Sequence, residues 1–242
     1  MVQGRRFGMG QRPAQPWLPV LLPVLLAARR PRGDTPTRAL TALAPRLGVA
    51  ETAAAPAVRP AGGGVHQRAS APPCAHDGPE RRIVRPQDPV AQTERERGKH
   101  SDHTGKHVLV VPALLRLRWR SDTSGGRVPD KRMADATPSP FPAGRGLGPA
   151  LGCLAFTLPQ VEILMPTKQP RGAERTLAQQ RTHQALHQRR LRMAQGNRSV
   201  KRWRVGHDRL RLGPQGVRDR VRELCGALHN FRVRLNPWPP MA

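Results

Sequence analysis

Three histidines stand close together in the middle of the chain, at a spacing that suits metal coordination. His100, His103 and His107 form an H-x2-H-x3-H pattern, and Asp102 adds a carboxylate between them. Imidazole and carboxylate groups are ligands of zinc and other transition metals. Two lysines flank the histidines, however, and no helix or strand is predicted to fix the direction of the rings. A solvated loop is therefore the favoured interpretation, and we predict neither a metal site nor a cofactor.

A basic stretch from Arg189 to Arg204 carries the side chains best suited to phosphate. Guanidinium groups form paired hydrogen bonds with phosphate oxygens, and a tryptophan can stack on a nucleobase. The stretch also has the layout of a two-part nuclear import signal. Basic residues are abundant everywhere in this chain, so such clusters arise by chance as well. The candidate nucleic-acid-binding residues are Arg189, Arg190, Arg192, Arg198, Lys201, Arg202, Trp203 and Arg204.

Sequence motifs of known catalytic sites are absent. The two Gly-Lys pairs, at 98–99 and 105–106, lack the glycine and the hydroxyl residue that a phosphate-binding loop requires. No G-x-S-x-G and no H-E-x-x-H pattern occurs. Cys74, His76 and Asp77 are neighbours in sequence, but adjacency does not create the geometry of a catalytic triad. We therefore predict no catalytic residues and no enzymatic activity.

The overall composition argues against a large core. The chain of 242 residues has 42 Lys and Arg against 16 Asp and Glu, a formal net charge of +26, with 27 Pro, 23 Gly, four Phe and no Tyr. A compact state would repel itself strongly and would bury few large side chains. The predicted fold class is mostly disordered or irregular, rich in Pro, Arg, Gly and Ala, with a candidate small α+β unit in the C-terminal third.

The enriched residues are those with GC-rich codons. This bias favours the hypothesis that the chain is a spurious or alternative-frame product of GC-rich DNA, without biochemical activity. Two alternatives stay open: a basic, largely disordered nucleic-acid-binding protein that acts through Arg189–Arg204, and an exported or organelle-targeted basic protein. In each case the charge predicts non-specific binding to polyanions, whether RNA, DNA or anionic lipid, and no specific partner.

The first two segments of the chain are predicted to be poor in stable structure. Residues 1–33 place arginines before an apolar run, Trp17–Ala28, as a secretory signal or a mitochondrial presequence does, and otherwise the location is unassigned. That run is too short for a transmembrane helix. Residues 34–170 are predicted to be low-complexity and largely disordered because prolines interrupt them. Within them, Val108–Val111 and the alternation up to Arg120 indicate an edge strand with one charged face, or a cationic membrane-surface segment.

The C-terminal segment, residues 171–236, is the candidate α+β unit, and residues 237–242 are a tail. Helix formers run from Ala173 to Gln195, and alternation around residues 203–212 indicates a hairpin. Alternation from Phe231 to Leu235 indicates a final strand. One helix has a clear apolar face, formed by Val217, Val221, Leu224, Cys225 and Leu228.

Overall fold

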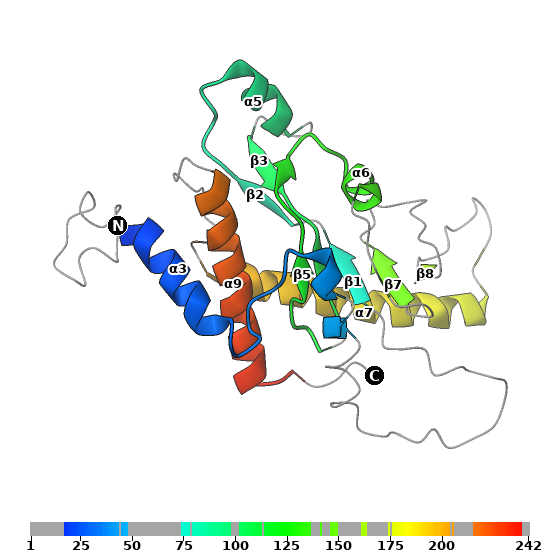
Figure 1. Cartoon of the computed structure of the whole chain (residues 1–242). Coiled ribbons are helices and arrows are strands. Elements are labelled where there is room, and N and C mark those ends of the chain that lie inside the picture. Colours follow the sequence, from blue (N-terminus) through cyan, green and yellow to red (C-terminus); the bar gives the residue numbers. More distant parts are fainter. Residues whose placement is uncertain are drawn as a thin grey trace.

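Two β-sheets and a set of helices make up the described part of the chain (Figure 1). The computed structural model describes residues 17–43, 45–47, 74–77, 79–97, 102–112, 114–136, 141, 146–149, 161–163, 174, 176–203, 205 and 215–238. The statements that follow concern these residues.

The larger sheet has five strands in the order β5-β4-β1-β7-β8. Its strands are β1 (Cys74–Asp77), β4 (Leu109–Val111), β5 (Trp119–Arg120), β7 (Gly146–Pro149) and β8 (Glu162–Ile163). The strand β4 runs antiparallel to β1 and β5, whereas β7 runs parallel to both β1 and β8. The carboxyl ends of β1 and β7 therefore meet at one edge of the sheet.

The smaller sheet is antiparallel, with the order β2-β3-β6. It consists of β2 (Glu80–Arg82), β3 (Thr104–Lys106) and β6 (Ser124–Gly125). Two short helices follow strands of this region, α5 (Pro89–Arg95) and α6 (Asp130–Asp135), and the 3-10 helix η1 spans Leu40–Ala42. Helix α5 begins where sequence rules place it, because the Asp88 carboxylate accepts the Ala91 amide at 2.7 Å and a proline follows it.

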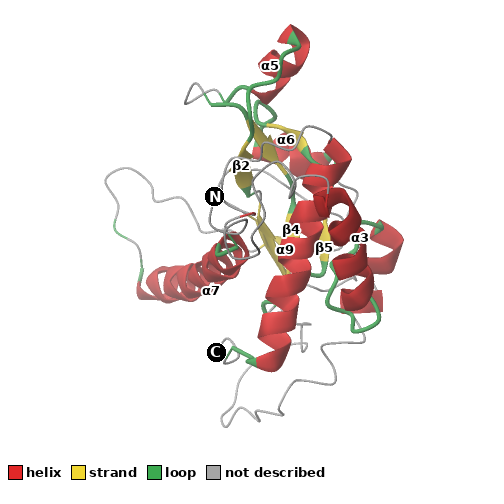
Figure 2. Cartoon of the chain, turned by 90° about the vertical axis from the view of Figure 1, so that its left-hand side faces the viewer, coloured by secondary structure: helices red, strands yellow, loops and turns green. Residues whose placement is uncertain are grey.

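The structure has three longer described helices, α3 (Trp17–Arg29), α7 (Leu177–Lys201) and α9 (Gln215–Leu235). Helix α9 contacts both of the others, and Figures 1 and 2 both show it beside α3. Helix α7 begins with a capping box in which Thr176 and Gln179 bond reciprocally to each other's backbone amides. The apolar face of α9 packs on α3 through a cluster formed by Leu22, Leu26, Val221, Leu224 and Cys225.

The strand β4 is buried on both faces and links two further clusters. Val108 and Val110 belong to one cluster, and Leu109 and Val111 to the other, as alternation along a strand requires. The first cluster gathers residues from distant parts of the chain, namely Leu43, Leu47, Trp119, Met133, Ala134, Phe141 and Leu147. The core is thus built from short apolar pieces that no local stretch of sequence displays together.

The predicted fold class, mostly disordered or irregular and of low complexity, is wrong. Residues 34–170 contain all the described strands as well as α5, α6 and η1. The prediction failed because it counted arginine only as a solvated charge. Arg81, Arg118 and Arg120 are 5%, 8% and 1% exposed, so their long stems fill interior space.

The predicted edge strand is confirmed in part. Its last two residues form β5, at the end of the strand order, whereas Leu109–Val111 form β4, an inner strand of the five-stranded sheet. A charged solvent face is wrong, since Arg118 and Arg120 are buried.

Among its described residues, the C-terminal third consists mainly of two long helices. The predicted helix from Ala173 corresponds to α7, and the predicted amphipathic face is confirmed in α9. The predicted last strand is wrong, because Phe231–Leu235 continues α9. Most of the predicted hairpin lies outside the described residues. Among the described helices, none combines the length and apolar character that crossing a membrane would demand.

Candidate functional site

A pocket lies where the two sheets meet the end of α7 and the middle of α9. Its wall comes from the start of β2, from the segment that leads into β4, and from one turn of each helix. The lining residues are Pro79, Glu80, Arg81, His107, Leu109, Leu117, Asn197, Val200, Lys201, Arg222 and Cys225. Pro79 stands two residues after the end of β1, so the pocket opens beside the carboxyl end of that strand.

Cationic side chains dominate the polar part of this wall. Arg81 and Arg222 are 5% and 6% exposed, whereas Lys201 is exposed at the rim. Arg222 donates to the Gly105 carbonyl at 3.3 Å and to the Thr123 hydroxyl. Burial, and next the nearby Arg81, lower the pKa of Arg222 to about 10, so the group stays charged at neutral pH. The wall therefore holds positive charge inside the protein, where it is screened less than at the surface.

His107 lies at the centre of this positive field. It is 8% exposed, and its Nδ1 atom has no hydrogen-bond partner among the described residues. Burial lowers its pKa well below the usual value, and four cations, led by Arg222 and Arg120, lower it further. His107 is consequently neutral at pH 7, and one of its ring nitrogens is buried without a hydrogen-bond partner among the described residues.

The acids near the pocket are already engaged in bonds. Glu80 accepts the Thr104 hydroxyl at 2.5 Å and pairs with Arg97 at 3.1 Å. Deeper inside, Asp219 lies 3.5 Å from Arg120 and accepts the Thr123 hydroxyl at 2.6 Å. These contacts balance Arg120 and part of Arg222, so the remaining positive potential faces the pocket.

The sequence-predicted nucleic-acid residues lie on the second half of α7 and just beyond it. Arg198, Lys201 and Arg202 are exposed, and Trp203 is 38% exposed. Arg190 is half-buried. The side chains of Arg189 and Arg192, and the whole of Arg204, lie outside the described parts. The structure thus brings the exposed end of this stretch to the rim of the pocket through Lys201.

The histidine motif is not assembled into a site in the described part of the chain. His100 lies outside it, and His103 forms an isolated β-bridge with Glu96. His107 instead joins the cationic pocket. Sequence reasoning missed Arg81 and Arg222 as pocket residues. For Arg222 the sequence does offer a signal: Asp219 and Arg222 are an i, i+3 pair on α9, directly beside the predicted apolar face.

One comparison with known proteins bears on this site. The family model described as DDE superfamily endonuclease matches residues 76–230, well over half of the chain. The chain belongs to this family. The matched span includes the second half of β1, all the other described strands, α7, most of α9 and every residue that lines the pocket. No curated protein and no solved structure matches the chain.

Family membership corrects two functional predictions and agrees with a third. A spurious frame would not reproduce a family pattern over residues 76–230, so the hypothesis of an alternative-frame product without activity is wrong. The prediction of no enzyme is wrong as well, because the family is one of endonucleases. The expectation of a nucleic-acid partner agrees with the family.

A nuclease that uses metal ions holds them with clustered carboxylates. The described residues do not fit such an ion, since no three His, Cys, Asp or Glu side chains among them converge. Asp77 ends β1, but its parallel neighbour β7 reads Gly-Leu-Gly-Pro, and the 25 residues of α7 include no acid. Cations stand in the pocket instead. We therefore derive no step through a metal ion.

Proposed function

We propose that this chain acts on DNA and binds its backbone phosphates at the end of α7, next to the cationic pocket. The endonuclease family supports DNA as the substrate and cleavage of internal phosphodiester bonds as the reaction class. The observation that carries the binding step is the exposed group formed by Arg198, Lys201 and Arg202 at the rim of the pocket. We call this group the α7 basic end.

Local charge on α7 supports this assignment. Residues three and four apart are neighbours on a helix surface, so Arg198 lies beside Lys201 and Arg202. With no aspartate or glutamate anywhere in α7, the helix contains no acid of its own to neutralise these groups. Exposed like charges that stand together repel one another, and a polyanion relieves this repulsion. Trp203 follows directly and offers a ring face to an unpaired base.

The test is the salt dependence of DNA binding. Fluorescence anisotropy of a labelled 20-base-pair duplex would be measured with the full chain at several salt concentrations. Each phosphate contact contributes about 0.9 to the slope of log K against log salt. Replacing Arg198, Lys201 and Arg202 together by glutamine is expected to reduce that slope by about 2.7, if each contacts one phosphate.

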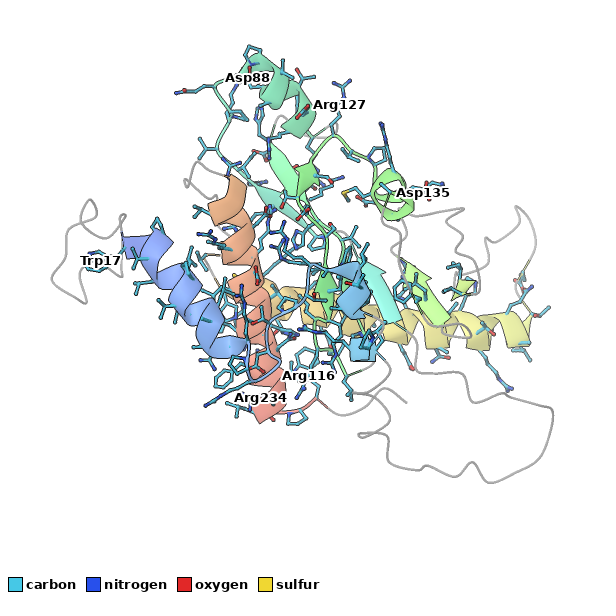
Figure 3. The ribbon with its side chains drawn as sticks, in the orientation of Figure 1. Trp17, Asp88, Arg116, Arg127, Asp135 and Arg234 are labelled. Atoms are coloured by element: carbon cyan, nitrogen blue, oxygen red, sulfur yellow. The ribbon has the colours of Figure 1, made fainter. Side chains whose placement is uncertain are left out.

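A matched control separates this surface from bulk charge. Arg127, Arg132 and Arg181 are also exposed, and their replacement by glutamine removes the same charge elsewhere. Figure 3 shows Arg127 near α5, far from α7. The control variant is expected to keep the wild-type slope to within about one contact, roughly 0.9. Equal losses in the two triple variants would show that only net charge matters, and absence of binding by the wild type would refute the proposed function.

A further inference from the structure

We propose that the pocket between Arg81, His107, Lys201 and Arg222 is a phosphate-binding site that works without a metal ion. This inference rests on the proposed function and assigns to the pocket one phosphate group of the bound backbone. The α7 basic end attracts the DNA backbone to the rim of the pocket, and the pocket holds one phosphate of that backbone.

The polar atoms of the pocket support an anion as the ligand. His107 Nδ1 and Arg222 Nε are buried and have no hydrogen-bond partner among the described residues. A buried donor without an acceptor destabilises the protein by about 1–3 kcal/mol. A phosphate oxygen is an acceptor for both nitrogens, and the Nδ1-protonated tautomer of neutral His107 is a donor. The pocket residues therefore contain hydrogen-bond donors without acceptors, and an anion supplies acceptors.

The charge of the wall favours the same ligand. Arg81 and Arg222 are buried, and Lys201 closes the rim. Glu80 is the one carboxylate among the lining residues, and it is engaged by Arg97 and Thr104. Charged hydrogen bonds from arginine to phosphate are short and strong when water is excluded.

The size of the pocket limits the ligand. The free volume inside it is about 30 Å³, and one water molecule needs about 10–15 Å³ on this scale. Two or three waters, or the oxygens of one phosphate group, match this space. Apolar lining by Leu109, Leu117 and Val200 excludes further water and strengthens the electrostatic attraction.

Inorganic phosphate is the probe for this site. The full chain would be titrated with phosphate at constant ionic strength, with chloride as the balancing anion and EDTA present throughout. We expect phosphate to raise the thermal unfolding midpoint of the wild type relative to chloride. Lys201→Gln, an exposed substitution at the rim, is expected to weaken phosphate binding by about tenfold, because a charged hydrogen bond is lost.

Arg181→Gln is the matched control for Lys201→Gln. It removes one exposed charge from the same helix, 20 residues earlier, which is about 30 Å along the axis. The control is expected to bind phosphate as the wild type does. A second measurement needs no variant: the imidazole nitrogen resonances of His107 should move with phosphate. Those of His229 should not, since its two ring nitrogens already contact Ser199 and the Leu115 carbonyl at 3.1 Å and 2.7 Å.

The outcomes separate the pocket from the proposed function. No stabilisation beyond chloride, equal phosphate affinity in the wild type and Lys201→Gln, or an unmoved His107 resonance would each overturn the pocket assignment. In any of these cases DNA binding through the α7 basic end would still stand if the duplex experiment succeeds. Failure of the duplex experiment, together with phosphate binding in the pocket, would instead reject DNA as the ligand source and keep the anion site.

Discussion

The buried charge network around Asp219 is expected to be the most sensitive point of the fold. Asp219 is 5% exposed, and its Oδ1 lies 3.5 Å from Arg120 and 3.9 Å from Arg222. The same oxygen accepts the Thr123 hydroxyl at 2.6 Å. Arg120 is the largest of the fully buried side chains, and its other acidic neighbour, Glu223, lies 3.9 Å away. Asp219→Ala therefore leaves two buried guanidinium groups without their shared counter-charge.

The size of the effect follows from the burial of the pair. Removing one partner of a buried ion pair destabilises a protein by about 3–5 kcal/mol, because the remaining charge stays desolvated. Such a loss is a large part of the total of about 5–15 kcal/mol that usually stabilises a domain. With a urea slope of about 2 kcal/mol per molar, the unfolding midpoint is expected to fall by about 1.5–2.5 M.

Urea unfolding followed by circular dichroism measures this shift. Asp135→Ala is the control, since Lys131 and Asp135 form an exposed i, i+4 pair whose contribution is about 0.3–0.5 kcal/mol. Asp219→Asn separates charge from shape: it keeps an acceptor for Thr123 but removes the negative charge, and we expect most of the full loss. The reasoning is refuted if Asp219→Ala destabilises the protein no more than Asp135→Ala does.

Two further predictions concern buried polar groups on α9. The Asn230 side chain accepts the Leu117 amide and donates to the Leu117 and Asp34 carbonyls, each at 2.7 Å. Asn230→Ala is therefore expected to lower the unfolding free energy by about 2–4 kcal/mol. Asn230→Asp should not recover that stability, because a carboxylate cannot donate to the two carbonyls. Burial raises the pKa of the Cys225 thiol from 9.0 to about 11. The buried thiol therefore contributes its full stabilisation of the folded state below pH 9. This stabilisation is lost as the pH rises, because the unfolded state releases the thiol proton first. Between pH 8 and pH 10 the wild type should lose about 1.3 kcal/mol more than Cys225→Ala in urea unfolding, and identical pH profiles would contradict the assigned pKa.

The sequence predicts those parts of the fold in which one element carries its own pattern. The apolar face of α9 repeats with helical spacing, so Val221, Leu224 and Cys225 were identified as buried. In the five-stranded sheet only β4 and β5 carry such a signal, because the strands have two to four residues each. β7 reads Gly-Leu-Gly-Pro, which by itself indicates a loop. Pairing with β1 and β8, set by contacts far away in sequence, makes it a strand.

The candidate site shows the same division. Its exposed part, from Arg198 to Trp203, is continuous in sequence and was found as a basic stretch. Its buried part joins Arg81, His107 and Arg222 from three separate elements. Nothing local distinguishes Arg81 from the many other arginines in the chain, and for Arg222 the one local signal is its i, i+3 spacing from Asp219. His107 was identified for a different chemistry, because its neighbours in sequence are histidines whereas its neighbours in space are cations.

The way the acids are used explains how so basic a chain folds and still keeps the excess positive charge that the proposed DNA binding requires. With 16 Asp and Glu against 42 Lys and Arg, each acid placed inside is unavailable to neutralise the surface. Asp34 is 2% exposed and pairs with Arg234, which Figure 3 shows near the end of α9, and Asp219 is bound to Arg120. Such pairs are neutral in themselves, so the whole excess of +26 remains with the other residues. Stability and DNA affinity therefore depend oppositely on added salt. Salt screens the repulsion among surface cations and so stabilises the fold, whereas it weakens phosphate binding through counterion release.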